Sequence, residues 1–231
     1  MATKPLIGIL AGMGPRSTAP FIDLVVTECQ LQYGAKDDCD FPGMMIYSLP
    51  APFYADRPID HAVMEETLHA GLRGLERAGV DFMAIACNTA HVYYPQLARD
   101  ARQPLLNMVA LTVDALAGTT HQVAVIGARP TIEAAIYQEG IARRGFSYVD
   151  PGWQPAVDTL IEALHEPLGP AALKARWNDL EEQAKAAGAD TIIVACADLS
   201  AASVGLQGVV VDATRCLAHE IVAEWLRRQR A

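Results

Sequence analysis

Two of the five cysteines occupy corresponding positions in a segment that occurs twice in this sequence. Residues 78–87 read AGVDFMAIAC and residues 187–196 read AGADTIIVAC, so the pair is Cys87 and Cys196. Each segment has a glycine that would end a helix, an aspartate, an apolar run typical of a buried strand, and a cysteine where that strand ends. A thiol can act as a nucleophile, a general base or a general acid, so the pair indicates covalent or proton-transfer chemistry.

Each of these two cysteines is followed directly by a predicted helix, which begins near Thr89 in one case and near Ala197 in the other. A helix N-terminus carries partial positive charge and free N–H groups, so we expect it to lower the pKa of the thiol and favour the thiolate. The alternative is that each cysteine completes a buried strand as a small apolar side chain. The recurrence in both segments favours the chemical interpretation. Cys29, Cys39 and Cys216 are predicted to be structural.

A glycine-rich turn follows the first apolar run, in the segment from Ala11 to Thr18 that contains Met13. Its backbone N–H groups could bind an anion at the N-terminus of the next helix, although a plain turn is an equally good interpretation. The segment is not the GxGxxG pattern of dinucleotide sites and lacks the lysine of a P-loop, so we predict no nucleotide site.

A loop rich in proline and aromatic residues, from Ser48 to Pro58, follows the second apolar run. Arg57 in this loop could clamp a carboxylate through its planar guanidinium, or it could simply pair with Asp56 at the surface. His91 lies about one helical turn after Cys87; it could relay a proton, but a core histidine with satisfied hydrogen bonds is the simpler interpretation. The six histidines show no metal-ligand spacing, so we predict no metal site.

Short apolar runs alternate with long helical patterns along the chain, which indicates a parallel α/β architecture. The predicted strands are Leu6–Ala11, Met44–Leu49, Phe82–Cys87, Leu105–Met108, Gln122–Gly127, Phe146–Val149, Thr191–Cys196 and Val209–Val211. The predicted helices are Thr18–Tyr33, Ile59–Ala78, Thr89–Arg99, Val109–Ala117, Ile132–Arg144, Gln154–His165, Pro170–Ala187 and Ala213–Arg230.

The repeated segments predict two similar Rossmann-like α/β domains with parallel sheets, facing each other about a pseudo-twofold axis. We place the first domain at residues 1–110 plus 213–231 and the second at residues 111–212. Parallel sheets bind ligands at the carboxyl ends of their strands, where both repeated cysteines stand. We therefore expect the active site in the cleft between the two domains.

Composition excludes several other classes of protein. The 231 residues include 18 Lys and Arg against 27 Asp and Glu, and a net charge of −9 argues against nonspecific nucleic-acid binding. No apolar run approaches the ~20 residues of a membrane span, and the apolar run 6–11 is too short and too soon interrupted for a signal peptide. An odd number of cysteines without CxxC spacing favours reduced thiols and a cytoplasmic protein.

Taken together, these motifs resemble the aspartate/glutamate racemase family, and most closely its aspartate racemase branch. The match runs in order over nearly the whole chain, and the CNTAH segment paired with the glycine turn is its most specific part. The matching segments are AGMGPRST at 11–18, ADR at 55–57, CNTAH at 87–91, the turn Gly127–Thr131, and ACAD at 195–198.

The resemblance implies a cofactor-independent racemase in which Cys87 and Cys196 act on opposite faces of the substrate Cα. One thiolate would remove the proton and the other thiol would deliver one to the far face. The resemblance also implies an amino-acid or dicarboxylate substrate, and a homodimer. It assigns substrate binding to Met13, Arg57, Asn88, Thr89, Thr131 and Ala197.

The sequence departs from the family pattern in the second half of the chain. The family reads GCTE where this chain reads ACAD, so Ala197 replaces a threonine and Asp198 shortens a glutamate. The lysine that the family places before a glycine is missing near Gly169, so a substrate less acidic than aspartate is an open alternative. Other open alternatives are an enzyme resembling maleate isomerases or arylmalonate decarboxylases, and a non-catalytic small-molecule binder. The presence of both cysteines disfavours the decarboxylases.

Overall fold

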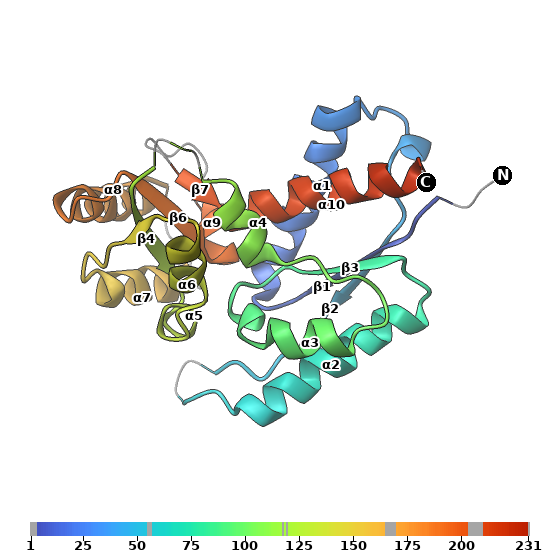
Figure 1. Cartoon of the computed structure of the whole chain (residues 1–231), viewed down its shortest axis with the longest axis horizontal. Helices are drawn as coiled ribbons and strands as arrows, with labels where there is room; N and C mark the ends of the chain where they lie inside the picture. The colour runs from blue at the N-terminus through green and yellow to red at the C-terminus, as the bar shows by residue number, and fades with distance from the viewer. Residues whose placement is uncertain are drawn as a thin grey trace. The chain divides into compact units, whose positions relative to one another are not determined.

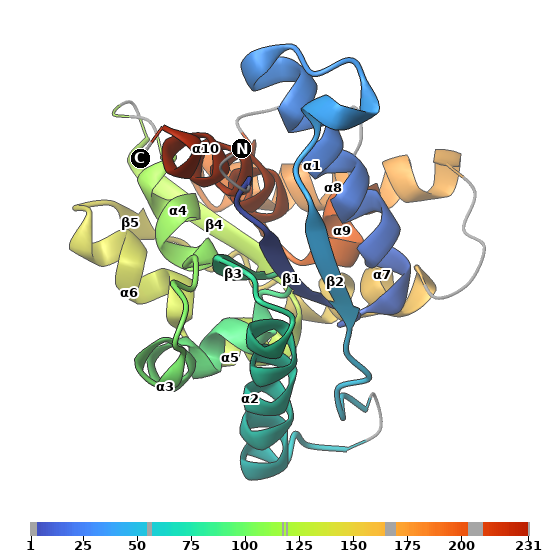
Figure 2. The same cartoon turned by 90° about the vertical axis from the view of Figure 1, so that its right-hand side faces the viewer.

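The computed structural model describes residues 4–54, 57–116, 118, 120–164, 170–202 and 210–230. The chain divides into a first unit, Met1–Met108 with Leu217–Ala231, and a second unit, Val109–Cys216. Each unit contains one parallel β-sheet with helices packed on it (Figures 1 and 2). The predicted α/β class with two parallel sheets is therefore confirmed.

The sheet of the first unit has the strand order β2-β1-β3, and both pairings are parallel. Figure 1 shows α2 and α3 on one side of this sheet and α1 and α10 on the other. The strands are β1 (Ile7–Ala11), β2 (Met44–Ser48) and β3 (Phe82–Ile85). The α-helices are α1 (Thr18–Tyr33), α2 (His61–Arg77), α3 (Tyr94–Asp100) and α10 (Ala213–Gln229), and the short 3-10 helices are η1 (Pro15–Ser17), η2 (Asp38–Asp40) and η3 (Thr89–Tyr93).

The sheet of the second unit has the order β5-β4-β6-β7, again with parallel pairings. Its strands are β4 (Gln122–Gly127), β5 (Ser147–Tyr148), β6 (Thr191–Ala195) and β7 (Val210–Asp212). Its helices are α4 (Met108–Asp114), α5 (Arg129–Glu133), α6 (Ile136–Arg143), α7 (Gln154–Ala163), α8 (Pro170–Ala186) and α9 (Ala197–Ala202).

The repeated segments perform the same structural task in the two units. Gly79 and Gly188 both adopt the left-handed conformation that ends a helix, with φ of +78° and +88°. Two residues later, Asp81 and Asp190 each accept a backbone N–H from the residue before the first strand of the unit, β1 or β4, at 2.6 Å and 2.8 Å. The repeat in the sequence therefore corresponds to a repeat in the fold, with β3 paired to β1 and β6 paired to β4.

Two predicted elements are wrong. The apolar run 105–108 makes only an isolated bridge, from Leu105 to Met83, because the chain turns into α4 at Met108 before a second residue can pair. The predicted helix over 132–144 is divided into α5 and α6, because Ala135 adopts a left-handed conformation with φ of +54°. The predicted helix over 89–99 is a 3-10 helix, η3, followed directly by α3. The other predicted strands and helices are present, most with ends shifted by a few residues.

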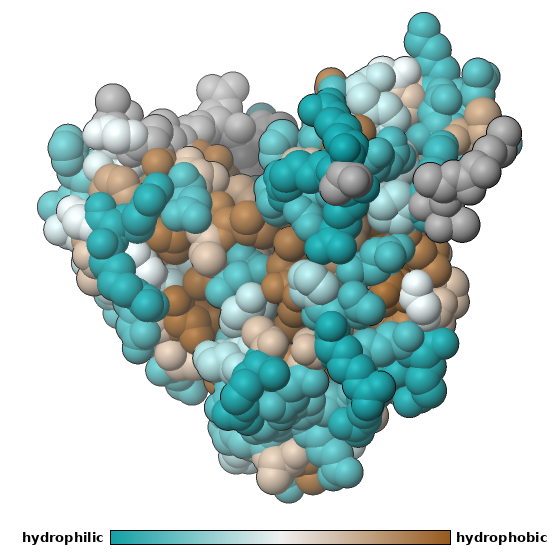
Figure 3. Space-filling view, turned by 45° about the vertical axis from the view of Figure 1, so that its right-hand side comes forward, coloured by the Kyte–Doolittle hydropathy of each residue, from teal (hydrophilic) through white to brown (hydrophobic). Residues whose placement is uncertain are grey.

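Apolar side chains fill the space between sheet and helices in each unit. One core cluster joins Leu10 of β1 and Leu68 of α2 to Cys87, and another joins Ile126 of β4 and Val157 of α7 to Cys196. Figure 3 shows hydrophilic residues interspersed with smaller apolar patches over the face it draws. Among the described residues, no helix is long and apolar enough to cross a membrane.

Candidate active site

Cys87 lies in a buried turn where β3 gives way to η3. The strand ends at Ile85, and the Ala86 N–H still donates to the Leu10 carbonyl of β1 at 2.9 Å. Cys87 is 6% exposed, and the neighbouring Asn88 is 3% exposed. A helical turn begins at Thr89, as predicted, so the thiol stands at the carboxyl end of a strand and at the start of a helix.

His91 connects this turn to Met108 through hydrogen bonds. Its Nδ1 lies 2.8 Å from the Cys87 carbonyl, and the Met108 N–H donates to its Nε2 at 3.1 Å. A carbonyl can only accept and an N–H can only donate, so the ring is neutral with its proton on Nδ1. Burial lowers the pKa of His91 to about 4, which favours the same neutral form. The structure therefore supports the core histidine and not the proton relay.

The glycine turn after β1 packs against Leu49, the residue that directly follows the neighbouring strand β2. Gly12 has φ of +91°, and a β-carbon placed there would lie 2.6 Å from the Leu49 nitrogen, so only glycine fits. Met13, 8% exposed, belongs to the same core cluster as Leu49 and Cys87. The carboxyl ends of β1, β2 and β3 thus bring the glycine turn and the first cysteine together.

Arg57 lies in the exposed part of the loop after β2. Its guanidinium carbon is 4.3 Å from the centroid of the Tyr54 ring, a cation–π contact that restricts the side chain. Residues 55 and 56 lie outside the described residues, and with them the predicted pairing of Arg57 with Asp56.

Cys196 lies at the matching place in the second unit. It follows β6 directly and precedes α9, and it is 9% exposed. The backbone N–H groups of Leu199 and Asp198, at the start of α9, lower its pKa, as a helix N-terminus should. Burial outweighs them and raises the pKa of Cys196 to about 11. The predicted lowering of this pKa is therefore wrong, because sequence reasoning included the helix and omitted the desolvation.

Two further predicted residues lie at the same edge of the second sheet. Thr131 is fully buried in the first turn of α5, just after β4, and its N–H donates to the Ala128 carbonyl at 2.9 Å. Ala197, 8% exposed, is the first residue of α9. Gly127 ends β4 so close to β6 that a β-carbon would lie 2.9 Å from the Ala195 carbonyl oxygen.

The structure thus collects the predicted residues other than Arg57 into two sets, one at the carboxyl edge of each sheet. The segment 165–169, where the sequence lacks the expected lysine, lies outside the described residues. Sequence reasoning missed Ser200 and Asp212, a buried hydroxyl–carboxylate pair beside Cys196 joined at 2.6 Å. An aspartate just before a helical pattern is an N-cap signal, and it could have identified Asp212.

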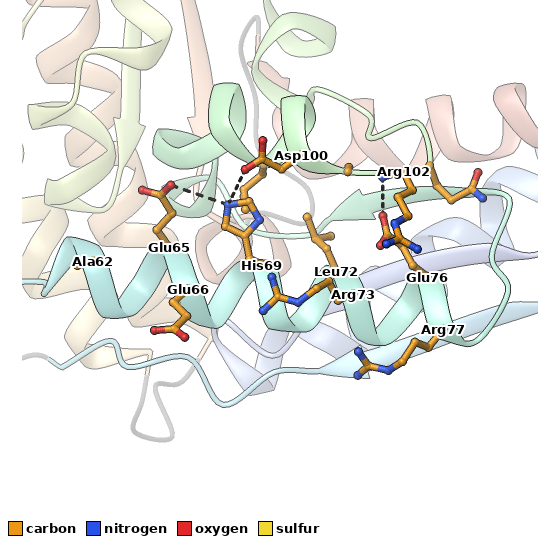
Figure 4. Close-up of a pocket in the computed structure, with 13 residues that line it drawn as sticks. Ala62, Glu65, Glu66, His69, Leu72, Arg73, Glu76, Arg77, Asp100 and Arg102 are labelled. Carbon is orange, nitrogen blue, oxygen red and sulfur yellow. Dashed lines mark hydrogen bonds and ion pairs between the residues drawn. The ribbon is translucent and has the colours of Figure 1, made fainter.

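A groove of about 1020 Å³ lies elsewhere on the first unit, along α2 and α3 (Figure 4). Its lining is strongly charged, and His69 stands between Glu65 at 3.8 Å and Asp100 at 3.7 Å. None of the predicted site residues lines it. Among the described residues, no three His, Cys, Asp or Glu side chains form a group that could hold a metal ion.

Comparisons with known proteins agree with the sequence motifs. Residues 10–221 match the family described as Asp/Glu/Hydantoin racemase. The chain is 44% identical over 227 residues to the broad specificity amino-acid racemase RacX of Bacillus subtilis (strain 168), covering 97% of this chain and 100% of that protein.

Solved structures show the same fold at low sequence identity. The aspartate racemase of Picrophilus torridus is 21% identical with a TM-score of 0.78, over 96% of this chain and 94% of that one. The glutamate racemase of Thermus thermophilus is 20% identical with a TM-score of 0.62, over 98% and 82% of the two chains. The sequence match over 212 of the 231 residues decides the relationship: the chain belongs to the Asp/Glu/hydantoin racemase family.

Proposed function

We propose that this protein is a cofactor-independent amino-acid racemase that uses Cys87 and Cys196 as an acid–base pair. One observation carries the proposal. In each unit a buried cysteine follows a strand, β3 or β6, and stands at the start of a helix. The two cysteines occupy equivalent positions, because both units repeat the same turn and the same aspartate contact. The named activity of the Bacillus subtilis relative supports the same conclusion.

Racemisation needs one base and one acid on opposite faces of Cα. The thiolate of one cysteine takes the Cα proton and becomes a thiol, which leaves a carbanion on the substrate. The thiol of the other cysteine gives a proton to the far face and becomes a thiolate. Atoms and charge balance, and the reverse reaction restores the starting state. We propose that the carboxyl edges of the two sheets flank one substrate, in a cleft between the domains.

The substrate carboxylate and amino group need fixed partners, because a carbanionic transition state is stabilised only by preorganised donors. We propose that Arg57 binds a carboxylate and that Asn88, Thr89 and Thr131 hold the other polar groups. The burial of the last three supports this, since each would present its polar atoms in a site that excludes water. Met13 and Ala197 would line the same site at the two sheet edges.

We propose a substrate range that includes aspartate and extends to less acidic amino acids. Ala197 offers a methyl group where the aspartate racemase branch has a threonine hydroxyl, so this side chain cannot hydrogen-bond to a substrate carboxylate. The Bacillus subtilis relative, which is named as broad in specificity, supports the wider range. We also propose that the enzyme is a cytoplasmic homodimer. Light scattering of the purified protein would test its oligomeric state.

The decisive experiment is proton NMR of the reduced protein in D₂O with L-aspartate, L-glutamate and a panel of neutral amino acids. Loss of a Cα–H signal, with the D-form appearing on chiral chromatography, is the expected result. Cys87→Ala and Cys196→Ala should each abolish racemisation, whereas Cys39→Ala, which changes an exposed cysteine, should not. Absence of exchange with every amino acid would overturn the proposal. Tight binding without exchange would indicate a binder, and a trapped diacid adduct would indicate an isomerase of the maleate type.

A further inference from the structure

A buried carboxylate and a buried hydroxyl lie beside Cys196 and take no part in the proton transfer described above. Asp212 is the last residue of β7, where it pairs in register with Val194 of β6, two residues before the cysteine. It is 7% exposed. The Ser200 hydroxyl, 4% exposed, donates to Asp212 Oδ2 at 2.6 Å. A hydrogen bond to an ionised carboxylate is short and strong, so this contact holds the two elements firmly.

The second oxygen of Asp212 caps the last helix. Oδ1 accepts the N–H groups of Thr214 at 2.8 Å and Arg215 at 3.3 Å, in the first turn of α10. A carboxylate is a favourable cap at a helix N-terminus, because it accepts hydrogen bonds from the free N–H groups there. One buried carboxylate therefore joins the start of α10 to Ser200 of α9.

Ser200 lies in the first turn of α9, which begins directly after Cys196. Its backbone N–H donates to the Cys196 carbonyl at 2.9 Å, and the N–H groups of Leu199 and Asp198 in the same turn lower the pKa of the Cys196 thiol. The direction of those two N–H groups depends on the position of the turn. The hydrogen bond from the Ser200 side chain to Asp212 of β7 fixes the position of the turn.

We propose that Ser200 and Asp212 are positioning residues for Cys196: their hydrogen bond holds the first turn of α9 in place next to the cysteine, and the Asp212 carboxylate adds a negative charge near this buried thiol. The inference rests on the proposed role of Cys196 in proton transfer. It makes Cys196, a buried thiol, the proton donor in the free protein.

The charges around Cys196 support this assignment. Asp198 on α9 and Asp212 on β7 both raise its pKa, in addition to the larger effect of burial. Arg215 on α10 partly offsets Asp212, with Nε at 3.7 Å from Oδ2. Cys216 on α10 and Tyr137 on α6 also face Asp212, and burial raises the pKa of both, so they stay neutral at pH 7.

The test measures the thiol directly and needs no substrate. Iodoacetamide labelling of Cys196, quantified by mass spectrometry of its peptide between pH 6 and 11, gives the pH at which this thiol ionises. Asp212→Asn keeps the size and the capping oxygen but removes the charge, so the labelling profile should move to lower pH. Asp179→Asn removes the charge of an exposed residue of the same unit and should leave the labelling profile unchanged.

Ser200 is tested through turnover. Ser200→Ala should lower kcat about tenfold with little change in KM, because the side chain orients the acid–base group and does not touch substrate. Ser200→Thr, which keeps the hydroxyl, should restore most of kcat.

An unchanged labelling profile in folded Asp212→Asn would overturn the electrostatic half of the proposal, and an unchanged kcat in Ser200→Ala would overturn the positioning half. If Asp212→Asn does not fold, Ser200→Ala still tests the pair by labelling, with an altered profile expected. If the wild-type protein racemises no amino acid, the proposed function fails, but the labelling result still tests the effect of Asp212 on Cys196. The failure of the proposed function and the failure of this inference are therefore distinguishable.

Discussion

Acid pH should destabilise the protein through His91, and the size of the effect follows from its surroundings. The folded state holds His91 neutral with a pKa of about 4, whereas the unfolded chain has the ordinary value of 6.5. Between these values the unfolded state binds more protons, so stability falls as the pH is lowered from about 7 towards 4. With these two values, the folded state loses about 2 kcal/mol at pH 5 relative to pH 7.5.

The physical reason is that protonating Nε2 would break its bond with the Met108 N–H and place a charge in the core. His91→Asn isolates the effect. Asparagine can still donate to the Cys87 carbonyl but offers no acceptor at the Nε2 position, so the variant should lose about 1–3 kcal/mol at pH 7.5. At pH 5 the gap between wild type and variant should shrink by about 2 kcal/mol, because the variant has no imidazole to protonate.

Urea unfolding followed by circular dichroism at the two pH values measures this gap. The control is Leu31→Ala, at an exposed position without a titratable group, which should keep a nearly constant gap from wild type. NMR of the histidine Cε1–H signals gives a second readout, in which the His91 signal should not titrate above pH 5. A gap that does not change with pH, or a His91 signal that titrates near pH 6.5, would refute the assignment of a neutral core histidine.

Two more predictions concern residues of the first unit. Gly12→Ala should cost more than 2 kcal/mol of stability in urea unfolding, because left-handed strain of about 1–2 kcal/mol is joined by a clash with the Leu49 backbone. Gly34→Ala has the same strain with open space around it and should cost only about 1 kcal/mol, so equal losses would contradict the clash. Arg57→Ala should raise KM for aspartate about tenfold or more in a racemisation assay. Tyr54→Ala should raise KM less, since Tyr54 only restrains the guanidinium. An unaltered KM in Arg57→Ala would contradict the proposed role of Arg57 in substrate binding.

Much of the fold was determined by local patterns in the sequence. Apolar runs of strand length, glycines at helix ends and helical periodicity depend only on neighbouring residues, so the bounds of α1 and β4 could be predicted correctly. The repeated AGxD segments placed Cys87 and Cys196 at two strand ends for the same reason. The family motifs then indicated the kind of chemistry, since residue type and order are visible without coordinates.

What the sequence could not determine depends on atoms that are distant in the chain. Asp81 bonds to a residue 75 positions away, and the Ser200–Asp212 pair forms only when α9 packs against the end of β7. The protonation of His91 and Cys196 was also decided by tertiary structure, because desolvation depends on every group packed around a side chain. A helix after a cysteine is visible in the sequence, whereas the burial that outweighs that helix is not.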